Sequence, residues 1–255
     1  MRLTVSGDQI LARVLDTTVS VCNIERAAAL ISEMVWSQTT GYICLENVHM
    51  CVEARRNPSL RQAVNNASYV FADGIPIVWY QKLMGYRQSE QVRGEDLTHA
   101  LCDLAVENGL ELGLLGSDLD TLGRMSENLE AKYDGLKIVF KCSPPFRELT
   151  EEEERVLIEK INDSGAKILF VGLGCPKQEI WMLRNNEKLE TVSIGIGAVF
   201  DFISGKKVSA PLFIRRIGLE WLYRFAKEPK RLWRRYLITN SLFIWYLFNK
   251  HILFR

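Results

Sequence analysis

The chain has 255 residues, of which 47% are hydrophobic and 25% are charged, a composition typical of a globular protein with a full core. Its six cysteines are scattered and form no C-x-x-C pair, which argues against a disulfide framework or a zinc site and favours a reducing cytosol. Residues 1–9 lack the apolar segment of a signal peptide, so we expect no export.

Charge is distributed unevenly along the chain, although the net charge is only +1. The segment from Lys206 to the C-terminus holds 12 Lys and Arg against two acids, and the residues before it hold 20 basic and 29 acidic ones. The two parts therefore carry charges of +10 and −9. This division predicts a basic element that meets an anionic partner, either a membrane or a nucleic acid, and the alternative is a basic helix face that is only solvated.

Short β-rich runs alternate with helical patterns as far as Gly205, and the residues before Glu25 allow a small extra strand or hairpin. This alternation predicts an α/β fold with a mostly parallel sheet and helices on both faces. The predicted strands are Tyr42–Leu45, Tyr69–Phe71, Leu112–Leu115, Lys137–Lys141, Ile168–Val171 and Val192–Ile196. The predicted helices are Glu25–Trp36, Pro58–Asn66, Ile75–Met84, Asp96–Val106, Asp120–Tyr133, Glu151–Asn162 and Lys177–Leu183.

The character of the sequence changes after Gly205. Pro211 and Pro229 each suit the first turn of a helix, which predicts helices over about 211–227 and 229–248. We therefore divide the chain into a sheet domain, residues 1–205, and a C-terminal helical appendage, residues 206–255.

Polar and glycine-rich clusters follow all six predicted strands. Ligands bind outside the carboxyl ends of the strands in an open α/β sheet, so these clusters predict one ligand site at one rim. The clusters are Asn47, Asp73-Gly74, Gly116-Ser117-Asp118, Ser143–Phe146, Gly172–Glu179 and Gly195–Asp201.

Several of these residues allow two interpretations. Gly172 and Gly174 could let a phosphate approach backbone N–H groups at a helix start, or they could only form a tight turn. Gln178 and Glu179 suit sugar hydroxyls but also an ordinary surface. Asp201 could contact a ribose diol or cap the residues that follow it.

Asp73 is the strongest candidate for catalysis. A carboxylate at a strand end could take a proton from an incoming hydroxyl as a general base. The alternative is a helix N-cap, a common position for Asp.

The pattern predicts chemistry without a metal. The three histidines lack metal-ligand spacing, and the one D-x-D sequence near a predicted strand end, Asp118-Leu-Asp120, lies at a predicted helix start that it would cap.

Aromatic residues alternate with Arg and Lys in the appendage. Arg224, Lys227, Arg231 and Arg234 recur at steps of three and four residues and suit a diphosphate. The apolar run 242–248 is too short to cross a bilayer, which predicts a helix that lies on the membrane surface. Binding to a nucleic acid would not require these apolar residues, so they favour a membrane as the partner. For part of the run, the alternative is a core helix or an oligomer interface.

Four segments together resemble the WecG/TagA/CpsF glycosyltransferase family, and the likeness extends from about Gly41 to Tyr236. They are Phe71–Gly74, Gly172–Glu179, Gly195–Phe202 and Gly218–Arg224 with Glu228–Arg231. The resemblance implies a Rossmann-like domain and an inverting, metal-independent enzyme on the cytoplasmic face of the membrane. Such an enzyme moves a sugar from a UDP-sugar donor to a saccharide linked to undecaprenyl diphosphate.

The resemblance also implies roles for individual residues. Asp73 would be the base, Asn47 and Gln178 would contact the sugar, and Asp201 would contact the nucleotide. The remaining donor-site candidates are Gly116, Ser117, Phe146, Gly172, Gly174 and Glu179. The arginines for the acceptor diphosphate would be Arg216, Arg224, Arg231 and Arg234.

The chain departs from the family pattern at three places. Leu45-Glu46-Asn47 stands where Thr-x-Asn is usual, Ser209-Ala-Pro211 where Arg-Ala-Pro is usual, and Asp73-Gly-Ile-Pro76 where Asp-Gly-x-Gly is usual. These changes leave the donor sugar open. The alternative belongs to a different class of function: a non-catalytic nucleotide-sensing module whose basic tail binds membrane or nucleic acid.

Overall fold

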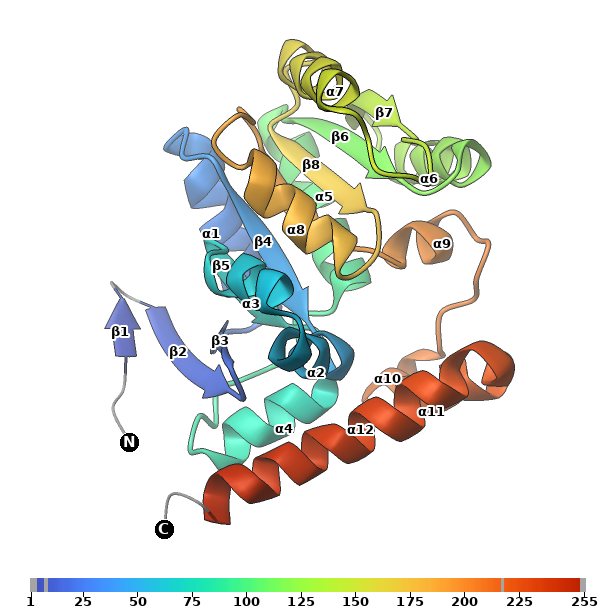
Figure 1. Ribbon diagram of the computed structural model, residues 1–255. Helices are drawn as coiled ribbons and strands as arrows, with labels where there is room; N and C mark the ends of the chain where they lie inside the picture. Colours follow the sequence, from blue (N-terminus) through green and yellow to red (C-terminus); the bar gives the residue numbers. More distant parts are fainter. Residues whose placement is uncertain (1–3, 7–8, 217, 253–255) are drawn as a thin grey trace.

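The computed structural model describes residues 4–6, 9–216 and 218–252 (Figure 1). Its centre is a six-stranded sheet in the order β5-β4-β9-β8-β6-β7, and all neighbouring strands are parallel. The strands are β4 (Gly41–Glu46), β5 (Tyr69–Ala72), β6 (Glu111–Gly116), β7 (Lys137–Cys142), β8 (Ile168–Gly172) and β9 (Val192–Gly195).

Helices cover both faces of this sheet and form two hydrophobic cores. Alternate residues of β4 point to opposite faces, so that Cys44 packs in one core and Ile43 and Leu45 pack in the other. One face carries α2 (Val48–Arg56), α3 (Pro58–Asn65), α4 (Ile75–Leu83), α7 (Glu151–Asp163) and α8 (Lys177–Asn185). The other carries α1 (Ile24–Trp36), α5 (Gly94–Asn108), α6 (Leu119–Lys132) and α9 (Val199–Ile203). The predicted α/β architecture is therefore confirmed.

A second, antiparallel sheet precedes the main one. It consists of β1 (Thr4–Ser6), β2 (Gln9–Val14) and β3 (Thr17–Ser20). The buried side chain of Gln81, in α4, donates to the backbone carbonyls of Val19 and Ser20 and so ties this sheet to the main domain. The sequence indicated at most a strand or hairpin in this region.

Two helix starts predicted from local sequence are confirmed. Thr150 begins α7 with a complete capping box, because its hydroxyl accepts from the Glu153 backbone N–H and the Glu153 carboxylate accepts in return. Asp118 caps α6 by accepting from the Thr121 backbone N–H at 3.0 Å. The six cysteines are free.

The helices α2 and α9 were not predicted. They are nine and five residues long, and α9 is too short to show helical periodicity. The predicted helix over 211–227 is divided into α10 (Leu212–Arg216) and α11 (Glu220–Lys227). The break falls at Gly218, whose φ of 75° leaves the helical region.

The last helix, α12 (Pro229–Ile252), lies along α2 (Figure 1). Phe243 is only 3% exposed in the core beneath it, and the guanidinium of Arg55 in α2 lies 4.5 Å from the ring centroid of Tyr246. Part of the apolar run 242–248 therefore forms a core contact, as the alternative interpretation held. Ile244, Trp245 and Phe248 of the same run are exposed.

Exposed apolar side chains recur along one broad side of α12, with Trp233, Leu237, Ile244 and Phe248 four or seven residues apart and two further residues adjacent to them. We call this set the outer face of α12; it comprises Trp233, Leu237, Ile238, Ile244, Trp245 and Phe248. Among the described residues, no helix combines the length and the apolarity that a membrane span requires.

Candidate active site

A cavity of about 510 Å³ opens at the carboxyl ends of β4, β5, β8 and β9. Residues of α11 and α12 line it as well, so the appendage forms one wall of it. This volume lies in the usual range for a small-molecule site. The residues predicted for chemistry that line it are Asn47, Asp73, Ser117, Gly172, Gly174, Gln178, Asp201 and Arg224.

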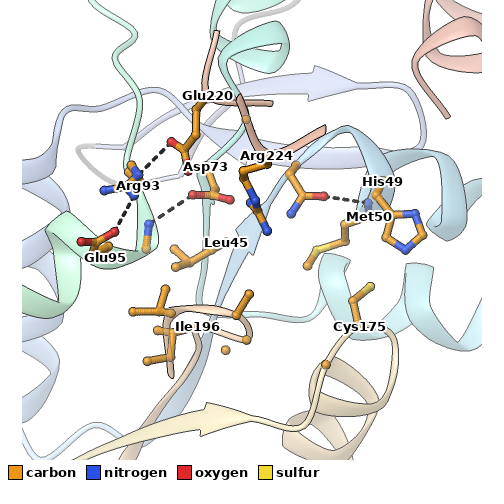
Figure 2. A pocket seen from close by; sticks show the side chains of 18 of the residues that line it. Leu45, His49, Met50, Asp73, Arg93, Glu95, Cys175, Ile196, Glu220 and Arg224 are labelled. Atoms are coloured by element: carbon orange, nitrogen blue, oxygen red, sulfur yellow. Dashed lines mark hydrogen bonds and ion pairs between the residues drawn. The ribbon is translucent and has the colours of Figure 1, made fainter. Parts of the chain in front are cut away.

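Asp73 follows β5 directly and lines this cavity (Figure 2). Its carboxylate does not cap α4: the N-cap of that helix is Gly74, and no side chain bonds there. Instead, Oδ1 of Asp73 accepts from the backbone N–H of Gly94 at 3.1 Å. The N-cap interpretation is therefore wrong, and the carboxylate is oriented by a segment distant in sequence.

The surroundings of Asp73 raise its pKa. Burial is the largest cause, since it disfavours the charged form, and the negative charge of Glu220 acts in the same direction. The Gly94 N–H and the positive charges of Arg93 and Arg224 oppose this rise. A carboxylate with a raised pKa is a stronger base than an ordinary aspartate.

Asn47 occupies the start of α2, next to Asp73 in space. Its side-chain oxygen accepts from the Met50 backbone N–H at 3.2 Å and caps the helix. Gly74 permits this proximity, because a Cβ there would lie 3.1 Å from the Cα of Asn47. The cap leaves the amide NH₂ of Asn47 as its donor group toward the cavity.

Gln178 is held in one orientation by two hydrogen bonds. Its Oε1 accepts from the backbone N–H of Gly174 at 3.2 Å, and its Nε2 donates to Oε1 of Glu179 at 2.6 Å. The Gly174 N–H thus already binds within the protein, which argues for a turn and against a phosphate site at that group. Glu179 is completely buried, and burial raises its pKa.

Asp201 lies in α9, beyond the end of β9, and lines the cavity. Its Oδ2 accepts from Nζ of Lys207 at 2.5 Å. Its side chain therefore forms an ion pair and is not the cap of the following turn that we considered.

Arg224 is the arginine of the appendage that the structure brings to the cavity (Figure 2). The side chains of Arg216, Arg231 and Arg234 lie outside the described part of the structure, so their predicted contact with a diphosphate stays a prediction.

Three predicted donor-site residues do not line the cavity. Phe146 is 86% exposed after β7, the strand at the sheet edge, and this position takes its loop away from the other strand ends. Gly116 packs against Gly172, because a Cβ on it would approach the backbone carbonyl of Gly172 to 2.5 Å. Glu179 lies beneath Gln178 and supports it.

The structure adds residues to the cavity that sequence reasoning missed. These include His49, Gln91, Arg93, Glu220 and Asn240. Glu220 carried a signal that could have been used, since it is one of two acids in a strongly basic segment. No group of His, Cys, Asp and Glu side chains that could hold a metal ion is found among the described residues.

A Rossmann-like sheet with polar side chains around a cavity at its strand ends places this protein in the α/β class whose ligands bind at the carboxyl ends of the strands. The family model described as the glycosyl transferase WecG/TagA/CpsF family matches residues 12–255, nearly the whole chain. This chain therefore belongs to that family, as the sequence motifs indicated. Membership indicates a glycosyltransferase of cell-surface polysaccharide synthesis, and it suggests a sugar nucleotide and a lipid-linked saccharide as substrates.

Proposed function

We propose that this protein transfers a hexosyl group from a UDP-sugar to a saccharide linked to a polyprenyl diphosphate, with inversion at the anomeric carbon and without a metal. One observation carries the proposal. A single cavity is lined both by Asp73, Asn47, Gln178 and Asp201 at the strand ends and by Arg224 of the appendage.

The donor would occupy the strand-end part of this cavity. The side-chain amides of Asn47 and Gln178 suit sugar hydroxyls, because hydrogen bonds to the protein fix the orientation of each amide. Asp201 would contact the nucleotide ribose.

The transfer would proceed in one displacement. Asp73 takes the proton from the acceptor hydroxyl as its oxygen forms a bond to the anomeric carbon, and the bond from that carbon to UDP breaks. Attack from the face opposite the leaving group inverts the configuration. The raised pKa of Asp73 supports the role of base.

Arg224 would pair with the acceptor diphosphate, since a guanidinium binds phosphate oxygens in a bidentate manner. The outer face of α12 would rest on the cytoplasmic face of the cell membrane, where the lipid anchor of the acceptor is located. The protein would thus be a peripheral membrane protein.

The decisive experiment is a panel of UDP-sugars tested against a sugar acceptor on a lipid diphosphate, with the anomeric configuration of the product read by NMR. We expect transfer from one donor, with inversion, in the presence of a chelator. A rise in melting temperature with UDP but no transfer from any donor would favour the nucleotide-sensing alternative. Retention of configuration would refute the single displacement.

A further inference from the structure

The first residues of α5 hold the carboxylate of Asp73. Gly94 donates its backbone N–H to Oδ1 of Asp73, and the position tolerates no side chain. A Cβ on Gly94 would lie 3.0 Å from Cγ2 of Val199 and 3.1 Å from Cδ1 of Leu45. The segment that begins α5 is therefore packed tightly against the rim of the sheet.

The preceding residue, Arg93, is only 5% exposed and is surrounded by carboxylates. Its guanidinium donates to Glu220 at 2.9 Å, to Glu95 at 2.5 Å and to Asp96 at 3.2 Å. An exposed ion pair contributes little to stability, but loss of one partner from a buried pair leaves an uncompensated charge. The contact between Arg93 and Glu220 belongs to the buried kind, with side chains 6% and 19% exposed.

The appendage touches this same segment at two more points. The hydroxyl of Ser209 donates to Glu95 at 2.5 Å, and Nη1 of Arg215 lies 3.3 Å from Oδ1 of Asp96. Ser209, which lies three positions before α10, Arg215 within α10 and the first residue of α11 are thus all anchored at residues 93–96.

The anchor at Glu220 has a direct consequence for the cavity. Glu220 is the first residue of α11 and Arg224 stands four residues later, so both lie on one face of that helix. Figure 2 shows Arg93 bonded to Glu220, with Asp73 and Arg224 beside them. The position of Arg224 over the cavity therefore depends on where Glu220 is held.

We propose that Arg93 is a positioning residue that docks α11 through Glu220 and thereby holds Arg224 beside Asp73. This inference rests on the proposed function in one respect, because it takes Arg224 to bind the acceptor diphosphate. It adds that acceptor binding depends on a buried arginine that does not itself need to touch the acceptor.

The test compares Arg93→Met, Glu220→Gln and the double variant with the wild-type protein. The matched control is Arg155→Met, an arginine that pairs with Glu152 and Glu159 on the exposed side of α7. We expect Arg93→Met to raise the KM for the lipid-diphosphate acceptor roughly tenfold or more, with the KM for the UDP-sugar unchanged. The double variant should be less impaired than the two single effects combined predict, because both remove one contact.

Hydrogen exchange of residues 220–227 supplies a second measurement that needs no activity. Arg93→Met should accelerate exchange there, and Glu220→Gln, which changes the other partner of the same ion pair, provides the same test if Arg93→Met folds poorly. Unchanged exchange in both variants would overturn the proposal, even if no acceptor were ever found. Equal increases in both KM values would also overturn it, because they would indicate a general structural role. Absence of transfer by the wild-type protein, with accelerated exchange in the variants, would refute the proposed function but not the docking role.

Discussion

Arg224 lies over the ring of Phe202, with its guanidinium carbon 5.1 Å from the ring centroid. This contact joins α11 to the segment after β9 that also carries Asp201. A cation–π contact of this kind stabilises by about 0.5–2 kcal/mol. This contact therefore holds the appendage against the carboxyl end of the sheet, where the nucleotide would bind.

Replacement of Arg224 by Met should weaken binding of the acceptor and leave binding of the donor unchanged. Loss of a charge-assisted contact to phosphate costs about 1.5–3 kcal/mol, so kcat/KM for the acceptor should fall roughly 10- to 100-fold. Steady-state kinetics with each substrate varied in turn checks this. Arg124→Met, which removes an exposed arginine paired with Asp120, serves as the control. A parallel loss of donor binding would contradict the assignment.

Asp73→Asn should reduce turnover by roughly 10²–10⁴-fold, the usual contribution of a general base. Donor binding should be largely retained, because the amide keeps the shape and can still accept from Gly94. The measurements are kcat and the shift in melting temperature with UDP. Asp163→Asn, at the exposed end of α7, is the control. Activity near that of the wild type would remove Asp73 from the reaction.

The pH dependence of kcat/KM should report the raised pKa of Asp73. The base acts only when deprotonated, so the rate falls as pH decreases through this pKa, and the acid limb should lie above the ordinary 3.8. Glu220→Gln removes a negative charge that raises the pKa and should shift the limb to lower pH. An unchanged limb would contradict this effect of Glu220. A limb at higher pH would instead show that the loss of the Arg224 charge, which lowers the same pKa and is displaced if α11 undocks, outweighs the loss of the Glu220 charge.

Trp245→Glu should weaken binding to anionic vesicles by roughly tenfold or more, because a large apolar side chain of the outer face of α12 is replaced by a charge that the vesicle repels. Trp36→Glu is a close control, since Trp36 is 58% exposed and Trp245 is 56% exposed, but Trp36 ends α1 on another side of the molecule. Vesicle sedimentation measures both. Equal effects of the two substitutions would argue against a docking surface on α12.

Glu46→Gln should make the protein more stable at pH 8. Glu46 is completely buried and accepts from the Thr17 hydroxyl at 2.8 Å, and burial raises its pKa from 4.5 to about 7. The unfolded state therefore ionises first as pH rises from 4.5 to 7, and the wild type loses stability over that range. The loss is on the order of 3 kcal/mol, at about 1.4 kcal/mol per pKa unit.

Denaturant unfolding at pH 4 and pH 8 measures the difference in free energy of unfolding between the wild type and Glu46→Gln. The two proteins should differ little at pH 4, where Glu46 is protonated in both states. If the difference in free energy of unfolding between the two proteins were the same at both pH values, the ionisation of Glu46 would not change on folding.

Local sequence was sufficient to predict the parallel sheet and the rim where Asn47, Asp73, Gln178 and Asp201 meet. Strand ends of a parallel sheet converge by geometry, so the order of strands did not need to be known. The order of the strands did matter for Phe146, because it follows β7, which lies at the edge of the sheet. No sequence pattern within 137–146 indicates that β7 is an edge strand.

Contacts between distant segments could not be predicted. Arg93 and Glu220 are far apart in sequence, and neither stands in a periodic pattern that would single it out. The same reason explains why Asp73 looked equally suited to an N-cap: its actual partner, Gly94, comes from another helix. The glycines at 172 and 174 were ambiguous because a turn and a phosphate loop share the same residues.

The packing of α12 on α2 limits what can be removed from this protein. A fragment that stops before Lys206 would uncover the side of α2 against which Phe243 and Tyr246 now pack. That apolar strip adjoins the helix start at Asn47, so we expect such a fragment to self-associate and to lose the shape of its sugar pocket. The helix α12, which would face the lipid, therefore also supports α2, whose first turn would help to hold the sugar.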